Sequence, residues 1–232
     1  TIKVTGKVVV DLNGKKLTGP DDGKANWYAF IVDGGDLTLK DSVETGELWA
    51  KCYGVETKSG SFTLDGAKIT ATKNATLGSA IVNYGGEVVI NSGTLAGNLA
   101  SVYTGGYFSD ASTTINAGKL TGPVVMEDWA DKTFTEVVKS ASNEYAIDES
   151  FEWVKEEGSD LYVLTAGYYA AKNTTTNTLY TSVEAALNAA KDGETVTLLW
   201  SEGDAAIAMN GAVYGKTVTI TGTATVDWSK GN

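Results

Sequence analysis

The residue types that could do chemistry in this sequence are carboxylates and lysines, because histidine is absent and all 18 basic residues are lysine. The closest carboxylate pair is Asp21 and Asp22, in the stretch GPDDGK. A glycoside hydrolase needs two carboxylates that flank the bond to be cleaved. No other phrase supplies carboxylates that would converge on this pair. We therefore interpret Asp21 and Asp22 as part of an exposed turn.

Two further acidic groups could gather a calcium ion, because calcium takes its ligands from several carboxylate and carbonyl oxygens. One group is Glu127, Asp128 and Asp131, and the other is Glu156, Glu157 and Asp160. Neither group follows the spacing of a known calcium loop. We interpret both as solvated acidic loops, and we predict no catalytic residue, no metal site and no cofactor.

Six aromatic residues are a stronger functional lead than the carboxylates. They are Trp27, Tyr28, Trp49, Tyr53, Tyr103 and Tyr107. All six lie near the same apolar segment of successive repeats, so that they would line one flank of the molecule. A row of exposed aromatic rings can hold sugar rings or a partner protein. The alternative is that several of these rings pack inward or cover turns.

The charge and composition exclude two classes of partner. A formal net charge of −11 repels a phosphate backbone, and the lysines are scattered rather than gathered in a stripe, so we predict no nucleic acid. No apolar run reaches the ~18 residues of a membrane span. The single cysteine, Cys52, has no partner for an internal disulfide, and we interpret it as a small buried apolar residue.

The elements that would position these side chains follow from an internal repeat. One apolar residue recurs at steps of 27, 25, 26 and 25 residues, and a glycine recurs with nearly the same spacing. The predicted anchors are Leu12, Leu39, Leu64, Ile90 and Ile115, and the predicted glycines are Gly35, Gly60 and Gly86. Each repeat holds about three short segments of alternating apolar and polar residues, which is typical of β-strands.

One such repeat cannot be stable alone. Burying an aliphatic side chain contributes roughly 1.5–3 kcal/mol, whereas each ordered backbone residue costs roughly 1–2 kcal/mol. A coil with only five or six inward side chains must therefore gain its stability from neighbouring coils. Stacking like residues over like at the strand spacing of about 4.8 Å meets that requirement and explains why the phrase recurs.

The phrases VVVDLNGKKLTG and AIVNYGGEVVINSGT resemble the right-handed parallel β-helix of the pectin-lyase-like kind, and more narrowly the repeats of large surface proteins of gut-type Gram-positive bacteria. The resemblance covers about residues 2–126 and implies an all-β solenoid with about 25 residues per coil. The family includes polysaccharide lyases and hydrolases. Their chemistry often relies on arginine or histidine, which this sequence lacks.

The repeat stops after Met126, which predicts three regions. Residues 1–126 would form a β-helix of about five coils without an N-terminal cap, residues 127–177 a connector with β-hairpins, and residues 178–232 a capping helix and the start of a second β-helix. The helix is expected near 182–191, with Thr181 and Glu184 as a capping box. We interpret the chain as a window of a longer tandem protein.

Together these features predict a non-catalytic structural or adhesive rod module of a large extracellular protein at the cell surface. Its partners would be carbohydrate, a host or partner protein, and adjacent repeats of the same chain. A rod of this kind would also serve as a phage virion fibre or decoration protein, which is the first alternative. A polysaccharide lyase or hydrolase built on the same β-helix is the second alternative.

Overall fold

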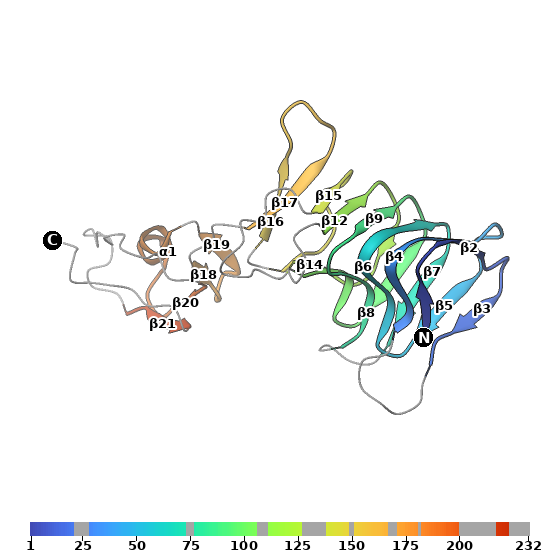
Figure 1. The fold of residues 1–232 in the computed structure, drawn as a ribbon. Helices are drawn as coiled ribbons and strands as arrows, with labels where there is room; N and C mark the ends of the chain where they lie inside the picture. Colours follow the sequence, from blue (N-terminus) through green and yellow to red (C-terminus); the bar gives the residue numbers. More distant parts are fainter. Residues whose placement is uncertain are drawn as a thin grey trace. The chain divides into compact units, whose positions relative to one another are not determined.

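The computed structural model describes residues 1–20, 28–72, 77–105, 111–126, 138–148, 151–166, 171–180, 182–199 and 217–222. Two compact units are present, one formed by residues 1–148 and 152–165 and the other by residues 149–151 and 166–232. The first unit consists of β-strands (Figure 1). None of the described helices has the length and apolar character needed to cross a membrane.

Two sheets of mostly parallel strands form the first unit, and we call the larger one the first sheet and the smaller one the second sheet. The second sheet has five strands in the order β13-β10-β7-β5-β3, namely β3 (Lys16–Thr18), β5 (Glu47–Ala50), β7 (Lys68–Ala71), β10 (Thr94–Gly97) and β13 (Lys119–Leu120). The first sheet has twelve strands: β1 (Ile2–Val4), β2 (Lys7–Asp11), β4 (Tyr28–Lys40), β6 (Tyr53–Asp65), β8 (Ser79–Asn83), β9 (Glu87–Ile90), β11 (Ala100–Thr104), β12 (Ser112–Ile115), β14 (Val124–Met126), β15 (Val138–Ser140), β16 (Phe151–Lys155) and β17 (Tyr162–Ala166).

The first sheet covers two sides of each coil because its longest strands turn a corner. The first half of β4 pairs with β1 and its second half pairs with β2, while β6 divides in the same way between β8 and β9. The corner lies at Gly35 and Gly60, which are register partners. Gly60 has φ of +86°, and a Cβ atom there would overlap the Gly35 carbonyl oxygen. Glycine at this corner is therefore a steric requirement of close stacking.

The predicted anchors form a column, with one exception. Leu39, Leu64, Ile90 and Ile115 are successive register partners on β4, β6, β9 and β12, and all four are fully buried. Leu12 is not part of this column, because Val10 pairs with Leu39. Leu12 is buried two residues further on, where its N–H donates to the Lys40 carbonyl at 2.9 Å.

A second column of apolar side chains follows the strands of the second sheet. Its members are successive register partners: Leu17, Leu48, Ile69, Leu95 and Leu120. All pairs in this sheet are parallel, as are those of the first sheet up to β15. The chain is thus a β-solenoid of about seven turns with roughly 25 residues per coil, which confirms the predicted fold class.

The parallel stack continues beyond residue 126, where the sequence placed its end. β15 pairs in parallel with β12, and β17 then pairs antiparallel with β15. β16 and β17 are neighbours in the sheet and form a hairpin whose turn lies near Gly158 (Figure 1). This change of direction ends the parallel part of the sheet among the described residues.

The second unit combines a small sheet with the predicted helix. β18 (Ala171–Asn173), β19 (Thr178–Tyr180) and β20 (Thr195–Leu198) pair antiparallel through β18, and β21 (Thr219–Gly222) adds in parallel to β20. The helix α1 (Val183–Ala189) buries Val183, Ala186 and Leu187. Its N-cap is Ser182, whose hydroxyl accepts from the Ala185 N–H at 3.0 Å. The prediction of Thr181 as the cap was therefore wrong by one residue, and Thr181 itself lies outside the described residues.

Candidate functional site

Two of the predicted aromatic residues stack directly on each other. Tyr28 on β4 and Tyr53 on β6 are register partners, and their ring centroids lie 4.8 Å apart with an interplanar angle of 18°. Parallel in-register pairing places like side chains on top of one another, so the stack follows from the repeat. Each ring thereby covers one face of the other, which leaves less aromatic surface for a ligand.

Tyr103 belongs to a different pair. Its ring meets that of Tyr84 edge to face, with 6.2 Å between the centroids and an interplanar angle of 76°. Tyr103 on β11 pairs with Val82, which pairs in turn with Glu56 on β6. We name Tyr28, Tyr53, Glu56, Tyr84 and Tyr103 the tyrosine cluster.

A buried carboxyl group lies in the tyrosine cluster. Glu56 is only 3% exposed, accepts a hydrogen bond from the Tyr28 hydroxyl, and has the Lys58 ammonium 3.5 Å from its Oε2 atom. Burial raises the pKa of Glu56 above its ordinary value, and it also raises the pKa of Tyr28. A carboxyl with a raised pKa can act as a general acid when a substrate reaches it.

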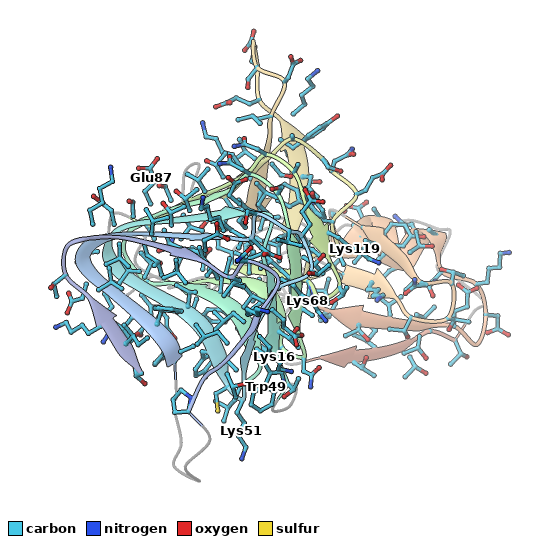
Figure 2. The ribbon with its side chains drawn as sticks, turned by 90° about the vertical axis from the view of Figure 1, so that its right-hand side faces the viewer. Lys16, Trp49, Lys51, Lys68, Glu87 and Lys119 are labelled. Atoms are coloured by element: carbon cyan, nitrogen blue, oxygen red, sulfur yellow. The ribbon has the colours of Figure 1, made fainter. Side chains whose placement is uncertain are left out.

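Trp49 is separated from the tyrosine cluster, because it lies on β5 in the second sheet. Its register partners are Thr18 and Thr70, and these outward positions form one column. The neighbouring outward column holds Lys16, Glu47, Lys68, Thr94 and Lys119. Figure 2 shows the three lysines following one another across the coils, with Trp49 beside Lys16. We name these two outward columns the Trp49 face.

The lysines of the Trp49 face are organised around one carboxylate. The Glu47 carboxylate lies 2.9 Å from the Lys16 ammonium and 3.0 Å from that of Lys68, and it accepts a hydrogen bond from the Thr70 hydroxyl at 2.8 Å. Burial alone would raise the pKa of Glu47, but these partners outweigh it and lower the pKa to about 2. The Lys16 ammonium also lies 5.7 Å from the centroid of the Trp49 ring, within the range of a cation–π contact.

The aromatic residues therefore do not make the single row that the sequence suggested. Among those described, Tyr28 and Tyr53 form one pair, Tyr103 belongs to another, and Trp49 faces outward from a different sheet. The reason is that their positions relative to the inward anchors differ from coil to coil, so they fall into separate columns. Trp27 and Tyr107 lie outside the described residues.

The acidic candidates do not assemble a site in the part of the chain that the structure describes. Glu156 forms an ion pair with Lys139 at 2.7 Å, and Asp160 lies 3.9 Å from Lys155. No group of three or more His, Cys, Asp or Glu side chains among the described residues could hold a metal ion. The other predicted candidates, Asp21, Asp22, Glu127, Asp128 and Asp131, lie outside those residues.

Sequence reasoning missed the lysine column and Glu56. A signal for the lysines was present, since Lys16, Lys68 and Lys119 each directly precede an anchor of the second sheet. Glu56 carries no comparable signal, because it alternates with the inward Val55 and so stands in an outward position, where a carboxylate is usually exposed.

The chain was compared with family models, curated proteins and solved structures, and none of the three comparisons found a significant match.

Proposed function

We propose that the chain is a non-catalytic structural or adhesive rod module of a large extracellular surface protein, which presents a repeated surface to carbohydrate or a partner protein. The observation that carries the proposal is the register of the two sheets, which repeats the same outward positions in every coil. A solenoid of this kind extends by adding coils, so it can project a binding surface and repeat it. The resemblance of the repeat phrases to Gram-positive surface proteins supports a place at the cell surface.

The Trp49 face is the surface best suited to an adhesive role. Its lysine column has three cations against one carboxylate, in a chain whose formal net charge is −11. Lys16 and Lys68 keep side-chain exposures of 55% and 49% despite their pairing with Glu47. An indole beside ammonium groups suits a sugar that carries a carboxylate or sulfate, because the ring packs on a sugar face and the cations meet its anionic group.

One observation favours a second candidate, a polysaccharide lyase or hydrolase. Glu56 is a buried carboxyl group with a raised pKa next to a tyrosine hydroxyl, which resembles an acid-base pair. Against this role, Glu56 is only 3% exposed, and nearby Asp33 is engaged by Lys3 at 2.7 Å. If the chain is such an enzyme, incubation with polyuronates and calcium should release unsaturated or reducing ends. Glu56→Gln should then abolish that release.

A glycan array tests the adhesive proposal. Wild type should bind acidic glycans, and Trp49→Ala and a Lys16→Gln/Lys68→Gln/Lys119→Gln variant should each lose at least about tenfold in signal, since a stacking or charge-assisted contact is worth about 1.4 kcal/mol or more. The matched control is Tyr162→Ala, which removes a partly buried aromatic from the hairpin instead. Equal signals from the wild type and both Trp49-face variants would contradict the proposal.

A further inference from the structure

The lysines of the Trp49 face stand on alternate coils. The column runs through adjacent strands as Lys16, Glu47, Lys68, Thr94 and Lys119, each a register partner of the next (Figure 2). A cation therefore alternates with a carboxylate or a hydroxyl group. Because adjacent strands lie about 4.8 Å apart, the backbones of consecutive lysines in the column lie about 10 Å apart. The positive charge of this face thus repeats every two coils.

Glu47 orders the first two lysines of the column. Its Oε2 atom lies 2.9 Å from the Lys16 ammonium and its Oε1 atom lies 3.0 Å from the Lys68 ammonium, so both ammonium groups are drawn towards the coil between them. The Thr70 hydroxyl donates to the same Oε1 atom at 2.8 Å. An ammonium group has three donors. Each lysine therefore keeps donors that point away from Glu47 and are already held in place for a ligand.

The charge of Glu47 opposes an anionic group placed over its own coil. Although burial alone would raise it, the pKa of Glu47 is lowered to about 2 by its partners, so the carboxylate is ionised near neutral pH. An anionic group that meets Lys16 or Lys68 is then driven to the side of the ammonium that faces away from Glu47. Two such groups are therefore accepted on either side of the Glu47 coil and rejected over it.

A neutral sugar, by contrast, fits over the coil of Glu47. A carboxylate has about four acceptor sites. The two ammonium groups and the Thr70 hydroxyl take three of them, which leaves one for a sugar hydroxyl. Trp49 follows two residues later on the same strand, and its register partners Thr18 and Thr70 have short side chains. The indole therefore rises beside this position, where it can pack on the apolar face of a sugar.

We propose that the Trp49 face binds a linear polysaccharide in which anionic and neutral sugars alternate, and that this polysaccharide runs across the strands along the stack of coils. One sugar of an extended chain advances by about the same distance as one coil, so each coil holds one sugar. Anionic sugars meet the three lysines, and neutral sugars lie over Glu47 and Thr94. Glu47 is the specificity residue, because it rejects a chain with an anionic group on every sugar. The inference rests on the proposed adhesive function and names its ligand class.

Two hexasaccharides with the same backbone test this specificity. Unsulfated chondroitin has a carboxylate on every second sugar, and chondroitin 4-sulfate adds a sulfate to each sugar between. By charge alone, the sulfated chain would bind a lysine surface more tightly. In calorimetric titrations at one ionic strength, we expect the unsulfated chain to bind the wild type at least threefold more tightly, and Glu47→Gln to reverse that order. Tighter binding of the sulfated chain to the wild type, or an unchanged order in Glu47→Gln, overturns the proposal.

A second variant separates specificity from folding, because Glu47→Gln also loses two ion pairs. Thr94→Glu places a carboxylate in the equivalent position between Lys68 and Lys119 and removes no ion pair. It should increase the preference for the unsulfated hexasaccharide at least threefold over that of the wild type. Equal weakening of both hexasaccharides would show a general loss of positive charge and would overturn the proposal.

A length series tests the direction of the bound chain. The unsulfated hexasaccharide should bind the wild type at least threefold more tightly than the tetrasaccharide, because its third carboxylate reaches Lys119. Lys119→Gln should abolish this gain, and a gain that survives would overturn the orientation along the stack. If both hexasaccharides bind equally and Trp49→Ala weakens both, this inference is wrong while the proposed function stands. If no acidic glycan binds, both are wrong.

Discussion

Leu64 and Ile90 are register partners on the adjacent parallel strands β6 and β9, and neither side chain has any exposure to solvent. They belong to neighbouring coils, 26 residues apart in sequence. The contact between them is repeated by Leu39 below and Ile115 above. Each coil is thus stabilised chiefly by the apolar side chains of the coils above and below it.

Truncating one member of this column should destabilise the stack. Leu64→Ala should lower the free energy of unfolding by about 2–5 kcal/mol, because it removes a buried side chain and leaves a cavity between two coils. The measurement is urea unfolding followed by circular dichroism. Val9→Ala serves as the control, since Val9 is 56% exposed on β2 and its truncation should cost less than about 0.5 kcal/mol.

The Asn83 side chain should contribute as much to the free energy of unfolding as a buried apolar side chain of the core. Its fully buried side-chain amide donates to the Gly86 and Ser112 carbonyls and the Thr113 hydroxyl, and its oxygen accepts from the Gly86 N–H at 3.0 Å. Asn83→Ala leaves several buried groups unpaired, so we expect a loss of about 2–5 kcal/mol in urea unfolding. Asn91→Ala, which breaks an exposed amide contact with Asn116, should stay within about 0.5 kcal/mol of the wild type. Similar losses from both variants would contradict this account of Asn83.

Gly60 and Gly6, two glycines at the corner of the first sheet, provide a matched pair of substitutions. Gly60→Ala should cost more than about 2 kcal/mol, because the new Cβ overlaps the Gly35 carbonyl oxygen and φ is +86°. Gly6→Ala should leave the midpoint of thermal unfolding nearly unchanged, since no atom lies within 4 Å of its Cβ position. If Gly60→Ala melted at the wild-type temperature, the close stacking of the corner would be wrong.

Glu56 should make the stability depend on pH in a direction unusual for a carboxyl group. Its pKa is raised by burial, so the folded state holds the proton more tightly than the unfolded state, whose value is near 4.5. Its contribution is therefore complete below about pH 4.5 and is lost as pH rises through the folded pKa. Glu56→Gln should raise stability at pH 7 by about 1 kcal/mol and have a smaller effect at pH 4.

Thermal melts of the wild type and Glu56→Gln at both pH values make that comparison. The control is Glu47→Gln. The pKa of Glu47 is lowered to about 2, so its stabilising contribution is complete above about pH 4.5 and fades as pH falls towards 2. Glu47→Gln should therefore lower stability at pH 7, opposite in sign to Glu56→Gln. Two shifts of the same sign would contradict the assigned environments.

The spacing of Leu39, Leu64, Ile90 and Ile115 was sufficient to predict the solenoid and its coil length, because stacked coils must repeat their inward residues at a fixed interval. The anchor of the first coil was harder to predict from the sequence. In VVVDLNG, both Val10 and Leu12 lie on the same side of an alternating segment, so either could have been the anchor. The observed register pairs Val10 with Leu39 and places Leu12 beyond the end of the strand.

The candidate site was less accessible to prediction than the fold. Outward residues are under no steric demand to repeat, so Tyr28, Trp49 and Tyr103 shared a region of the sequence without sharing a column. The burial of Glu56 and Asn83 depends on contacts with other coils, which have no signature in the local sequence.

The most direct test of the stacked columns is a methyl NOE spectrum of the protein labelled at leucine and isoleucine methyl groups. Adjacent rungs lie about 4.8 Å apart, and residues three rungs apart lie about 14 Å apart. We predict cross-peaks between Leu64 and Ile90 and between Leu39 and Leu64, with none between Leu39 and Ile115. Absence of the Leu64–Ile90 cross-peak, or a cross-peak between Leu39 and Ile115, would contradict the stacked arrangement.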